Sequence, residues 1–158
     1  MTEEQSDHPD INKNIHPPIV TLFYILIAML LGRFVQVPVA VPDVLQKIGF
    51  VLILIGFLFG LSAIIEFRKA HTTLDPHGSV SSVASSGVYR ITRNPIYLCF
   101  LFIIIGFPLN FGNFWGLILS PLFIITMNNL VIKNEETYLE KKFKEQYTGY
   151  KSHVRRWL

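Results

Sequence analysis

The chain has little of what a soluble enzyme is usually built from. Charged residues make up 16% of its 158 residues, against roughly 25% in average globular proteins. Its single cysteine excludes an intrachain disulfide and a zinc site built from cysteines. His71, His77 and His153 have no metal-ligand spacing, and the serine-rich segment 78–87 lacks the lysine of a phosphate-binding loop. We expect no bound metal and no nucleic-acid partner.

The chain is instead rich in long apolar runs. Hydrophobic residues make up 51% of the chain, and its mean hydropathy is +0.42. A membrane-spanning helix needs about 20 mostly apolar residues, and the sequence has runs at 19–37, 48–65, 96–107 and 114–132. The third run stops before Pro108, and a short turn joins it to the fourth. We predict an all-α, polytopic integral membrane protein with four transmembrane helices, the last two forming a hairpin.

The positive charges are unevenly distributed about these spans. Four spans place both ends of the chain on one face, together with 12 of the 14 lysines and arginines. The two on the other face are Arg33 and Lys47. Because loops rich in lysine and arginine stay in the cytoplasm, we predict cytoplasmic termini.

The predicted organisation is a single domain, 1–158. We expect a flexible tail at 1–16, helices and a cytoplasmic loop at 17–132, and a cytoplasmic interfacial segment at 133–158. That last segment carries an apolar stripe at helical spacing: Leu139, Phe143, Tyr147, Tyr150, Val154 and Trp157. With lysines on its other faces, it is typical of an amphipathic helix lying on an anionic leaflet, bent at Gly149. The alternative is a solvated amphipathic tail.

The polar stretch 87–98, GVYRITRNPIYL, comes directly before the third apolar run. Asparagine is a favoured N-cap and proline a favoured first helical residue, so Asn94 and Pro95 should begin a helix there. Its free N–H groups and positive dipole end, with Arg90 and Arg93 beside them, would suit a carboxylate or a phosphate. The alternative is a plain helix start with arginines that snorkel to the membrane surface.

An acid pair, Glu135 and Glu136, follows the fourth run on the same face. Neighbouring residues on a helix point about 100° apart, so only one of the two should face a given pocket squarely. The alternative is an acid pair that stabilises a helix N-terminus.

Two motifs, in this order, resemble those of the isoprenylcysteine carboxyl methyltransferase family in its short bacterial form, a group related to the phospholipid N-methyltransferases. The family pattern is G-x-Y-x-x-x-R-[HN]-P-x-Y, then E-E-x-x-L-x-x-x-F-x-x-x-Y-x-x-Y. The matching residues are Gly87, Tyr89, Arg93, Asn94, Pro95 and Tyr97, then Glu135, Glu136, Leu139, Phe143, Tyr147 and Tyr150. The resemblance covers residues 48–158.

The resemblance implies a bacterial inner membrane protein that binds S-adenosyl-L-methionine at the cytoplasmic edge of its helices. It implies that Glu135, with Glu136 beside it, binds this cofactor. The other implied cofactor-binding residues are Ser82, Val83, Ala84, Tyr89, Asn94, Pro95, Ile96 and Tyr97. Arg93 is the candidate catalytic residue, as the holder of an anionic group.

We therefore predict an S-adenosylmethionine-dependent methyltransferase with membrane lipids around it and a lipophilic or amphiphilic acceptor, such as a prenylcysteine-like carboxylate. In-line displacement needs chiefly alignment, so we assign no general base. Family members that methylate a carboxylate carry an arginine four residues before the acid pair, where this chain has Val131. Two alternatives are a phospholipid amine N-methyltransferase and a non-catalytic membrane scaffold.

Overall fold

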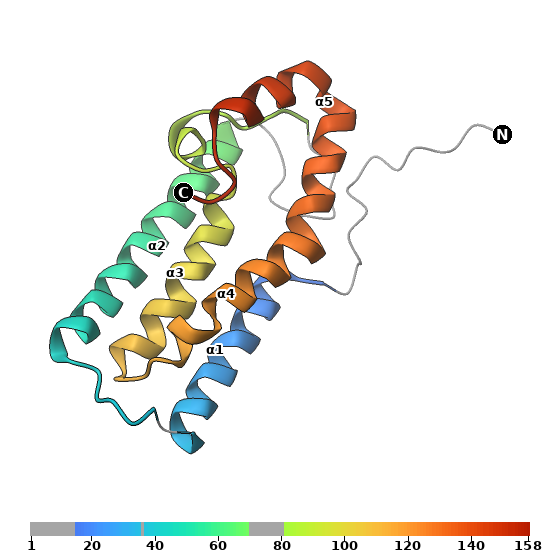
Figure 1. Ribbon diagram of the computed structural model, residues 1–158. Helices are drawn as coiled ribbons and strands as arrows, with labels where there is room; N and C mark the ends of the chain where they lie inside the picture. Colours follow the sequence, from blue (N-terminus) through green and yellow to red (C-terminus); the bar gives the residue numbers. More distant parts are fainter. Residues whose placement is uncertain (1–14, 36, 70–80) are drawn as a thin grey trace.

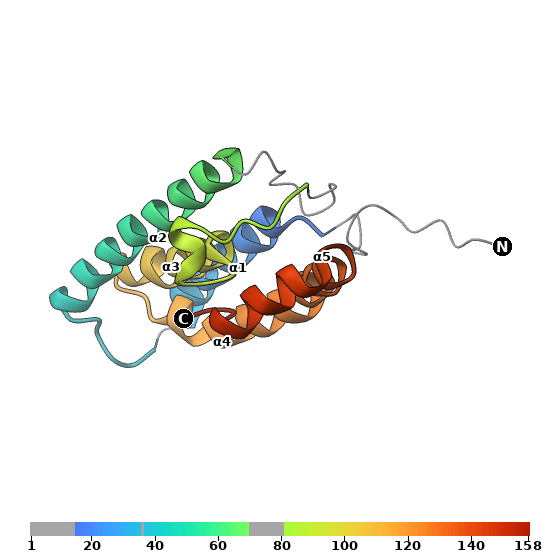
Figure 2. The ribbon, with the colours of Figure 1, turned by 90° about the horizontal axis from the view of Figure 1, so that it is seen from above.

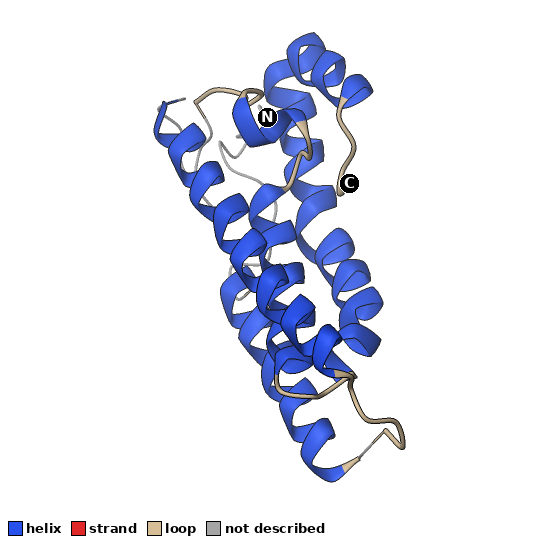
Figure 3. Ribbon diagram, turned by 90° about the vertical axis from the view of Figure 1, so that its left-hand side faces the viewer, coloured by secondary structure: helices blue, strands red, loops and turns tan. Residues whose placement is uncertain are grey.

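The computed structural model describes residues 15–35, 37–69 and 81–158, so the predicted N-terminal tail lies almost entirely outside the described residues. These ranges contain helices and no strand, which confirms the all-α fold class (Figure 3). The elements are α1 (Pro17–Phe34), α2 (Asp43–Lys69), the 3₁₀ turn η1 (Gly87–Arg90), α3 (Pro95–Asn110), α4 (Trp115–Met127), the π-helical turn η2 (Asn128–Ile132) and α5 (Lys133–His153).

The helices run up and down in alternation. The start of α1, the end of α2, the start of α3 and the last residues therefore lie at one end of the bundle (Figure 1). We call this end, which also holds η1 and α5, the polar end. Three helices are long and apolar enough to cross a membrane, namely α1, α2 and the helix 115–153, and α3 is a shorter apolar helix. This finding confirms a polytopic membrane architecture.

The shortest of these helices, α3, lies at the centre, in contact with α1, α2 and α4. Its 16 residues extend about 24 Å, less than a bilayer core of about 30 Å. Neighbouring helices cover most of its length, because residues such as Leu98 and Ile104 are fully buried. A helix enclosed in this way need not match the lipid thickness by itself.

Pro108 lies inside α3 instead of ending it, so the predicted stop at residue 107 is wrong. A proline leaves the carbonyl four residues earlier without its helical donor, and that carbonyl belongs to Ile104. Gly116 of α4 packs directly against it, since a Cβ at Gly116 would lie 2.2 Å from the Ile104 oxygen. The missing side chain at Gly116 lets the next helix cover the free carbonyl.

The contact between α2 and α3 depends on small residues. A Cβ at Gly106 would lie 2.5 Å from the Gly49 oxygen, and a Cβ at Gly49 would lie 2.7 Å from the Gly106 oxygen. Close backbone approach of this kind stabilises helix pairs in membranes. The outer side of α2 exposes large apolar side chains such as Phe57 and Leu58, which suits contact with lipid.

The helix of the fourth apolar run continues beyond residue 132, because α4, η2 and α5 form one continuous helix. The wider π-helical turn leaves two adjacent residues, Val131 and Ile132, fully buried together. Glu135 and Glu136 follow them by one helical turn, so both acids point inward. The two acids contact different partners, since Glu135 bonds Tyr97 and Glu136 pairs with Arg156. The expectation that only one of them faces a given pocket squarely stays a prediction. π-Helical turns are frequent at functional sites.

A second irregularity, at Lys144, turns α5 back across the polar end (Figures 1 and 2). Its φ of 45° and ψ of −121° lie outside the helical region. The predicted bend at Gly149 is wrong, because Gly149 lies within the second helical half. Part of the predicted interfacial stripe thus faces the protein: Tyr147 is buried, and Trp157 packs against the main core cluster.

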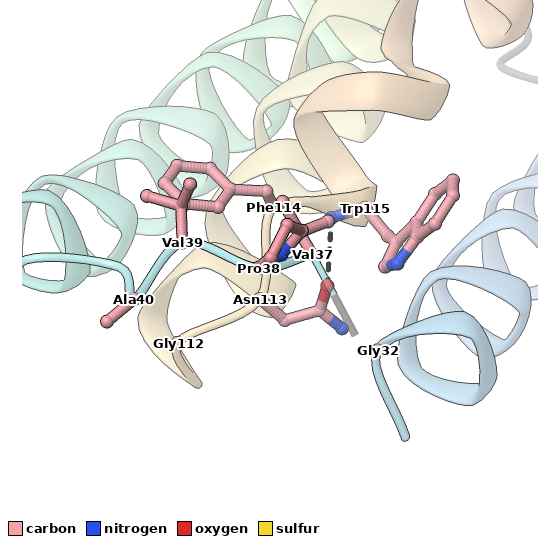
Figure 4. A pocket seen from close by; sticks show the side chains of 9 residues that line it. All are labelled: Gly32, Val37, Pro38, Val39, Ala40, Gly112, Asn113, Phe114 and Trp115. Atoms are coloured by element: carbon pink, nitrogen blue, oxygen red, sulfur yellow. Dashed lines mark hydrogen bonds between the residues drawn. The ribbon is translucent and has the colours of Figure 1, made fainter. Parts of the chain in front are cut away.

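The opposite end of the bundle holds a cavity of about 310 Å³ lined by residues 32, 37–40 and 112–115 (Figure 4). The Asn113 side chain joins two walls of this cavity. It donates to the Ala28 carbonyl oxygen at 2.8 Å and accepts from the Trp115 backbone N–H at 2.8 Å. This cavity contains none of the residues that the sequence motifs single out.

Candidate active site

Four parts of the chain meet at the polar end: η1, the first turn of α3, α5, and the segment 154–158 that follows it. They bring together most of the residues that the sequence predicts for the site. Two clusters of ionisable side chains result, one centred on Glu135 and one on Arg93.

Glu135 is paired with Tyr97 of α3. The Tyr97 hydroxyl donates to Glu135 Oε1 at 2.7 Å. Burial raises the pKa of Glu135 to about 7; the Tyr97 hydrogen bond opposes this shift and the charge of Glu136 adds to it. A carboxyl with such a pKa is poised to ionise, and it would do so fully when a cation binds next to it.

Glu136 is buried among cations. Arg156 takes both of its oxygens, with Nε 2.9 Å from Oε1 and Nη2 2.6 Å from Oε2. Arg93 Nη1 lies 3.2 Å from Oε1, and Lys151 Nζ lies 3.8 Å from Oε2. Burial raises the pKa of Glu136, but the hydrogen bonds from Arg156 and the charges of Arg93 and Lys151 outweigh it and lower the pKa overall. Glu136 is therefore an ionised structural counter-ion.

Arg93 has donors to spare. Its side chain is only 9% exposed, and its Nε and Nη1 atoms are buried without a hydrogen-bond partner among the described residues. The Nη1 contact with Glu136 is an ion pair without hydrogen-bond geometry. Tyr147 is also beside Arg93: burial raises the pKa of Tyr147 to about 12, and a hydrogen bond with Arg93 opposes the shift. Because buried donors are nearly always satisfied, Arg93 is prepared for an anion.

Asn94 occupies the N-cap position of α3, as predicted, and Pro95 is the buried first residue. The Asn94 side chain does not cap the helix, however; it donates to the Arg156 oxygen at 2.9 Å. Thr92 Oγ1 donates to the same oxygen at 3.1 Å. The expected side-chain cap is therefore wrong, because the C-terminal segment competes for the asparagine.

Tyr89 and Ile96 meet in a second apolar cluster, where Tyr89 is buried with Ala63 and Val88 while Ile96, Ala84 and Tyr150 pack around them. The Tyr150 hydroxyl donates to the Tyr89 oxygen at 2.7 Å and so joins η1 to α5. Ser82 and Val83 lie half-buried just before Ala84, and neither belongs to this cluster.

The motif glycine Gly87 fits against Glu66, near the end of α2. Its φ is 55°, in the left-handed region that favours glycine. A Cβ there would lie 2.7 Å from the Glu66 carboxyl carbon. Glu66 also accepts hydrogen bonds from Ser86 and Lys69. These contacts fix the loop before η1 to α2.

Sequence reasoning did not single out Thr92, Arg156 or Glu66 as site residues. Arg156 carries no signal of its own, because it is one of two adjacent arginines in a basic segment. Thr92 and Glu66 act through contacts with residues 64 and 20 positions away, respectively, and no spacing rule predicts such pairs. In the described part of the chain, no group of three or more His, Cys, Asp or Glu could hold a metal.

Comparisons with known proteins show the family of the chain. A family model described as phospholipid methyltransferase matches residues 45–146. A Haemophilus influenzae protein described as uncharacterized is 43% identical over 63 residues, which is 40% of this chain and the whole of that protein. No solved structure matches. The matched region 45–146 includes nearly all of α2, the polar stretch 87–98 and the acid pair.

Proposed function

The chain belongs to the phospholipid methyltransferase family, and from this we propose that it is an S-adenosylmethionine-dependent enzyme that methylates a lipid-borne acceptor at the polar end. One observation carries the proposal: a carboxyl that is ready to ionise and a buried arginine with free donors belong to the same end of the bundle. The cofactor has a cationic sulfonium, an ammonium and a carboxylate, so it needs groups of both signs.

The chain's own residues have distinct tasks in this proposal. Glu135 binds the cationic part of the cofactor, and the Tyr97 hydroxyl fixes the orientation of its Oε1. Arg93 binds an anionic group through Nε and Nη1. Charge pairing of this kind is stronger in a site from which water is excluded.

When bound, S-adenosylmethionine supplies an electrophilic methyl group on a positively charged sulfur. The protein has to align an acceptor lone pair with this group and keep competing water away, and such alignment is worth several kcal/mol. The apolar cluster of Tyr89, Ile96 and Tyr150 supplies a dry wall for that purpose. No described residue is needed as a base for a carboxylate, or for an amine headgroup that has released its proton to water before it attacks.

An amine acceptor has a specific observation in its favour. The position at which carboxylate-methylating relatives carry an arginine is Val131 here, and Val131 is fully buried in the main apolar core. Thus no cation from this position reaches an acceptor carboxylate. A phospholipid with a primary amine headgroup therefore fits better than a prenylcysteine-like carboxylate, which is the second candidate.

Labelling separates these candidates. Purified protein in vesicles would receive S-adenosylmethionine with a radioactive methyl group, together with either an amine-headgroup phospholipid or a prenylcysteine. We expect label in the phospholipid and none in vesicles of choline-headgroup lipid alone. Label in the prenylcysteine only would reverse the acceptor assignment. Absence of both label and cofactor binding would favour the scaffold alternative.

We further propose that the polar end faces the cytoplasm of a bacterial inner membrane. Arg33 and Lys47 lie at the opposite end, whereas Arg68, Lys69 and the basic residues of α5 lie at the polar end. This asymmetry follows the rule that cationic loops are retained in the cytoplasm, where S-adenosylmethionine is made available.

A further inference from the structure

The carboxylate of Glu136 is shared unequally by the cations around it. Arg156 faces both oxygens with a two-pronged contact, at 2.9 and 2.6 Å. Paired N–H donors of this kind match a carboxylate best and form its strongest ion pair. Arg93, although 3.2 Å away, does not reach hydrogen-bond geometry with its Nη1 atom.

The free donors of Arg93 are thus a consequence of the position of Arg156. Glu136 is the acid partnered with Arg93 among the described ion pairs, so without Arg156 its oxygens would be available to the Arg93 guanidinium. An intramolecular carboxylate would then occupy the donors that the proposed function reserves for a ligand. One carboxylate cannot satisfy the donors of two arginines, so one guanidinium keeps donors without a partner.

The backbone holds Arg156 in this position. Its carbonyl oxygen accepts from both Thr92 and Asn94, on either side of Arg93 in the sequence. The Arg93 backbone N–H donates to the Arg155 oxygen at 2.9 Å. The segment 154–158 therefore runs alongside the residues that precede α3, and places the two guanidinium groups on the same carboxylate.

We propose that Arg156 is a positioning residue that engages Glu136 so that Arg93 keeps its donors for an anionic group of the cofactor or of the acceptor. This role rests on the proposed function, because it assumes that Arg93 binds an anion. It also gives Glu136 a task different from that of Glu135: Glu136 is the counter-ion of Arg156 and does not bind the cofactor.

Two ligands and the acceptor together show which anionic group Arg93 binds. S-adenosylhomocysteine has a carboxylate, 5′-methylthioadenosine lacks the whole amino-acid part, and the acceptor is followed through its KM in the labelling assay. Arg93→Gln is measured first, by calorimetry in detergent. Weaker binding of S-adenosylhomocysteine alone identifies the cofactor carboxylate, whereas a higher acceptor KM alone identifies the acceptor. If neither changes, Arg93 binds no ligand anion, and that part of the proposed function is wrong.

Arg156→Gln should then reproduce the Arg93→Gln effect, with about tenfold weaker binding of the same ligand, the loss expected for one charge-assisted contact. The double variant Arg156→Gln with Glu136→Gln should recover to within about threefold of the wild type, because an amide competes poorly for Arg93. Arg155→Gln is the matched control, since it removes a neighbouring exposed charge from the same segment, and it should bind like the wild type.

A purely structural role of Arg156 predicts a different result. The double variant would then be no better than Arg156→Gln, because Glu136→Gln restores no contact of the segment, and the proposal would be overturned. An unaffected Arg156→Gln beside an impaired Arg93→Gln would also overturn it. If Arg156→Gln does not fold, Glu136→Gln alone decides: binding at or above the wild-type level supports the proposal, and weaker binding refutes it.

Discussion

The Tyr97 hydroxyl and Glu135 Oε1 lie 2.7 Å apart, although the two residues are separated by 38 positions in the sequence. Their hydrogen bond joins the first turn of α3 to α5 across the site. It also decides how the carboxyl titrates, since it is the main influence that holds the raised pKa of Glu135 down. Both the affinity for a cation and its dependence on pH should follow from this pair.

Cofactor affinity should rise with pH up to about 7 and then level off. In the proposed function Glu135 binds a cation in its ionised form, and burial raises the pKa of this carboxyl to about 7. Below that value affinity should fall towards tenfold per pH unit. Glu135→Gln should weaken S-adenosylhomocysteine binding by about one to two orders of magnitude at pH 8 and remove the pH dependence. Calorimetry across this range tests it; an unchanged slope in the variant would assign the titration to another group.

The same carboxyl should affect stability in the opposite sense. In the unliganded protein its folded pKa of about 7 exceeds the usual unfolded value of about 4.3. Between these two pH values the folded state keeps the Glu135 proton and the unfolded state loses it. The protonated carboxyl therefore stabilises the folded state fully at low pH, and this contribution is lost as the pH rises through 7. The melting temperature of the wild type should thus decline relative to that of Glu135→Gln between these pH values. A constant difference between the two would contradict the raised pKa.

Tyr97→Phe should move the pH profile of cofactor binding upward. Removing the hydroxyl removes the hydrogen bond that lowers the pKa of Glu135, while burial still raises it. Affinity at pH 7 should fall, by about tenfold for the loss of one charge-assisted bond, and recover at higher pH. Tyr24→Phe is the control, because its hydroxyl bonds Thr126 at 2.8 Å, away from the acid pair. A profile that keeps its midpoint would mean that Tyr97 does not control Glu135.

Asn94→Ala should lower the free energy of unfolding by about 1 kcal/mol through loss of its bond to Arg156. It should also weaken anion binding, because the same bond fixes the position of Arg156. Thermal unfolding and calorimetry on the same sample measure the two effects. Asn134→Ala is a suitable control, since its side chain makes only a 3.5 Å contact at the surface of α5. Loss of stability without loss of binding would separate the segment 154–158 from the site.

Gly106→Ala should destabilise the α2–α3 contact, because the added Cβ would lie 2.5 Å from the Gly49 oxygen. Overpacking of this kind typically costs about 1–3 kcal/mol. Gly149→Ala is the matched control: its Cβ meets nothing within 4 Å, and alanine favours the helix by up to about 1 kcal/mol. Thermal melting in detergent should therefore move in opposite directions for the two variants. Equal shifts would mean that the close approach at Gly106 is absent.

Cysteine labelling tests the orientation. Asp43 is exposed at the start of α2, and Ser152 is exposed near the end of α5, at opposite ends of the bundle. With the native Cys99 replaced by serine, an impermeant reagent outside intact cells should label Asp43→Cys and not Ser152→Cys. The reverse pattern would place the polar end outside the cytoplasm, and labelling of both would contradict a spanning bundle.

Local sequence was enough to predict the helices but not their irregularities. The apolar runs predict which segments are long enough to cross a membrane, and Asn94–Pro95 predicts where α3 begins. Each of these signals depends only on residues that are neighbours in the sequence. Pro108, Lys144 and the turn η2 contradict the local rules, because tertiary contacts stabilise conformations that isolated sequence disfavours. Proline within a helix and a lysine at φ 45° are of this kind.

The site shows the same division. Tyr97 and Glu135 could be singled out because each belongs to a recognisable motif. The different roles of Arg93 and Arg156 could not be predicted from the sequence. They depend on which guanidinium donates to both oxygens of Glu136. Adjacent basic residues look alike in a sequence, and only their partners distinguish them.

The unequal lengths of α2 and α3 recess the start of α3 relative to the end of α2. Their lower ends are level, because Asn110 of α3 bonds the Gln46 oxygen near the start of α2 at 3.0 Å. At the polar end, Ile96 packs beside Ala63, and α2 continues to Lys69, about 9 Å further. A headgroup layer is about 5–7 Å thick on each side of the hydrocarbon. The start of α3 is therefore recessed below the end of α2 by about the thickness of one headgroup layer, and in the proposed function an acceptor would be methylated there while its acyl chains remain in the leaflet.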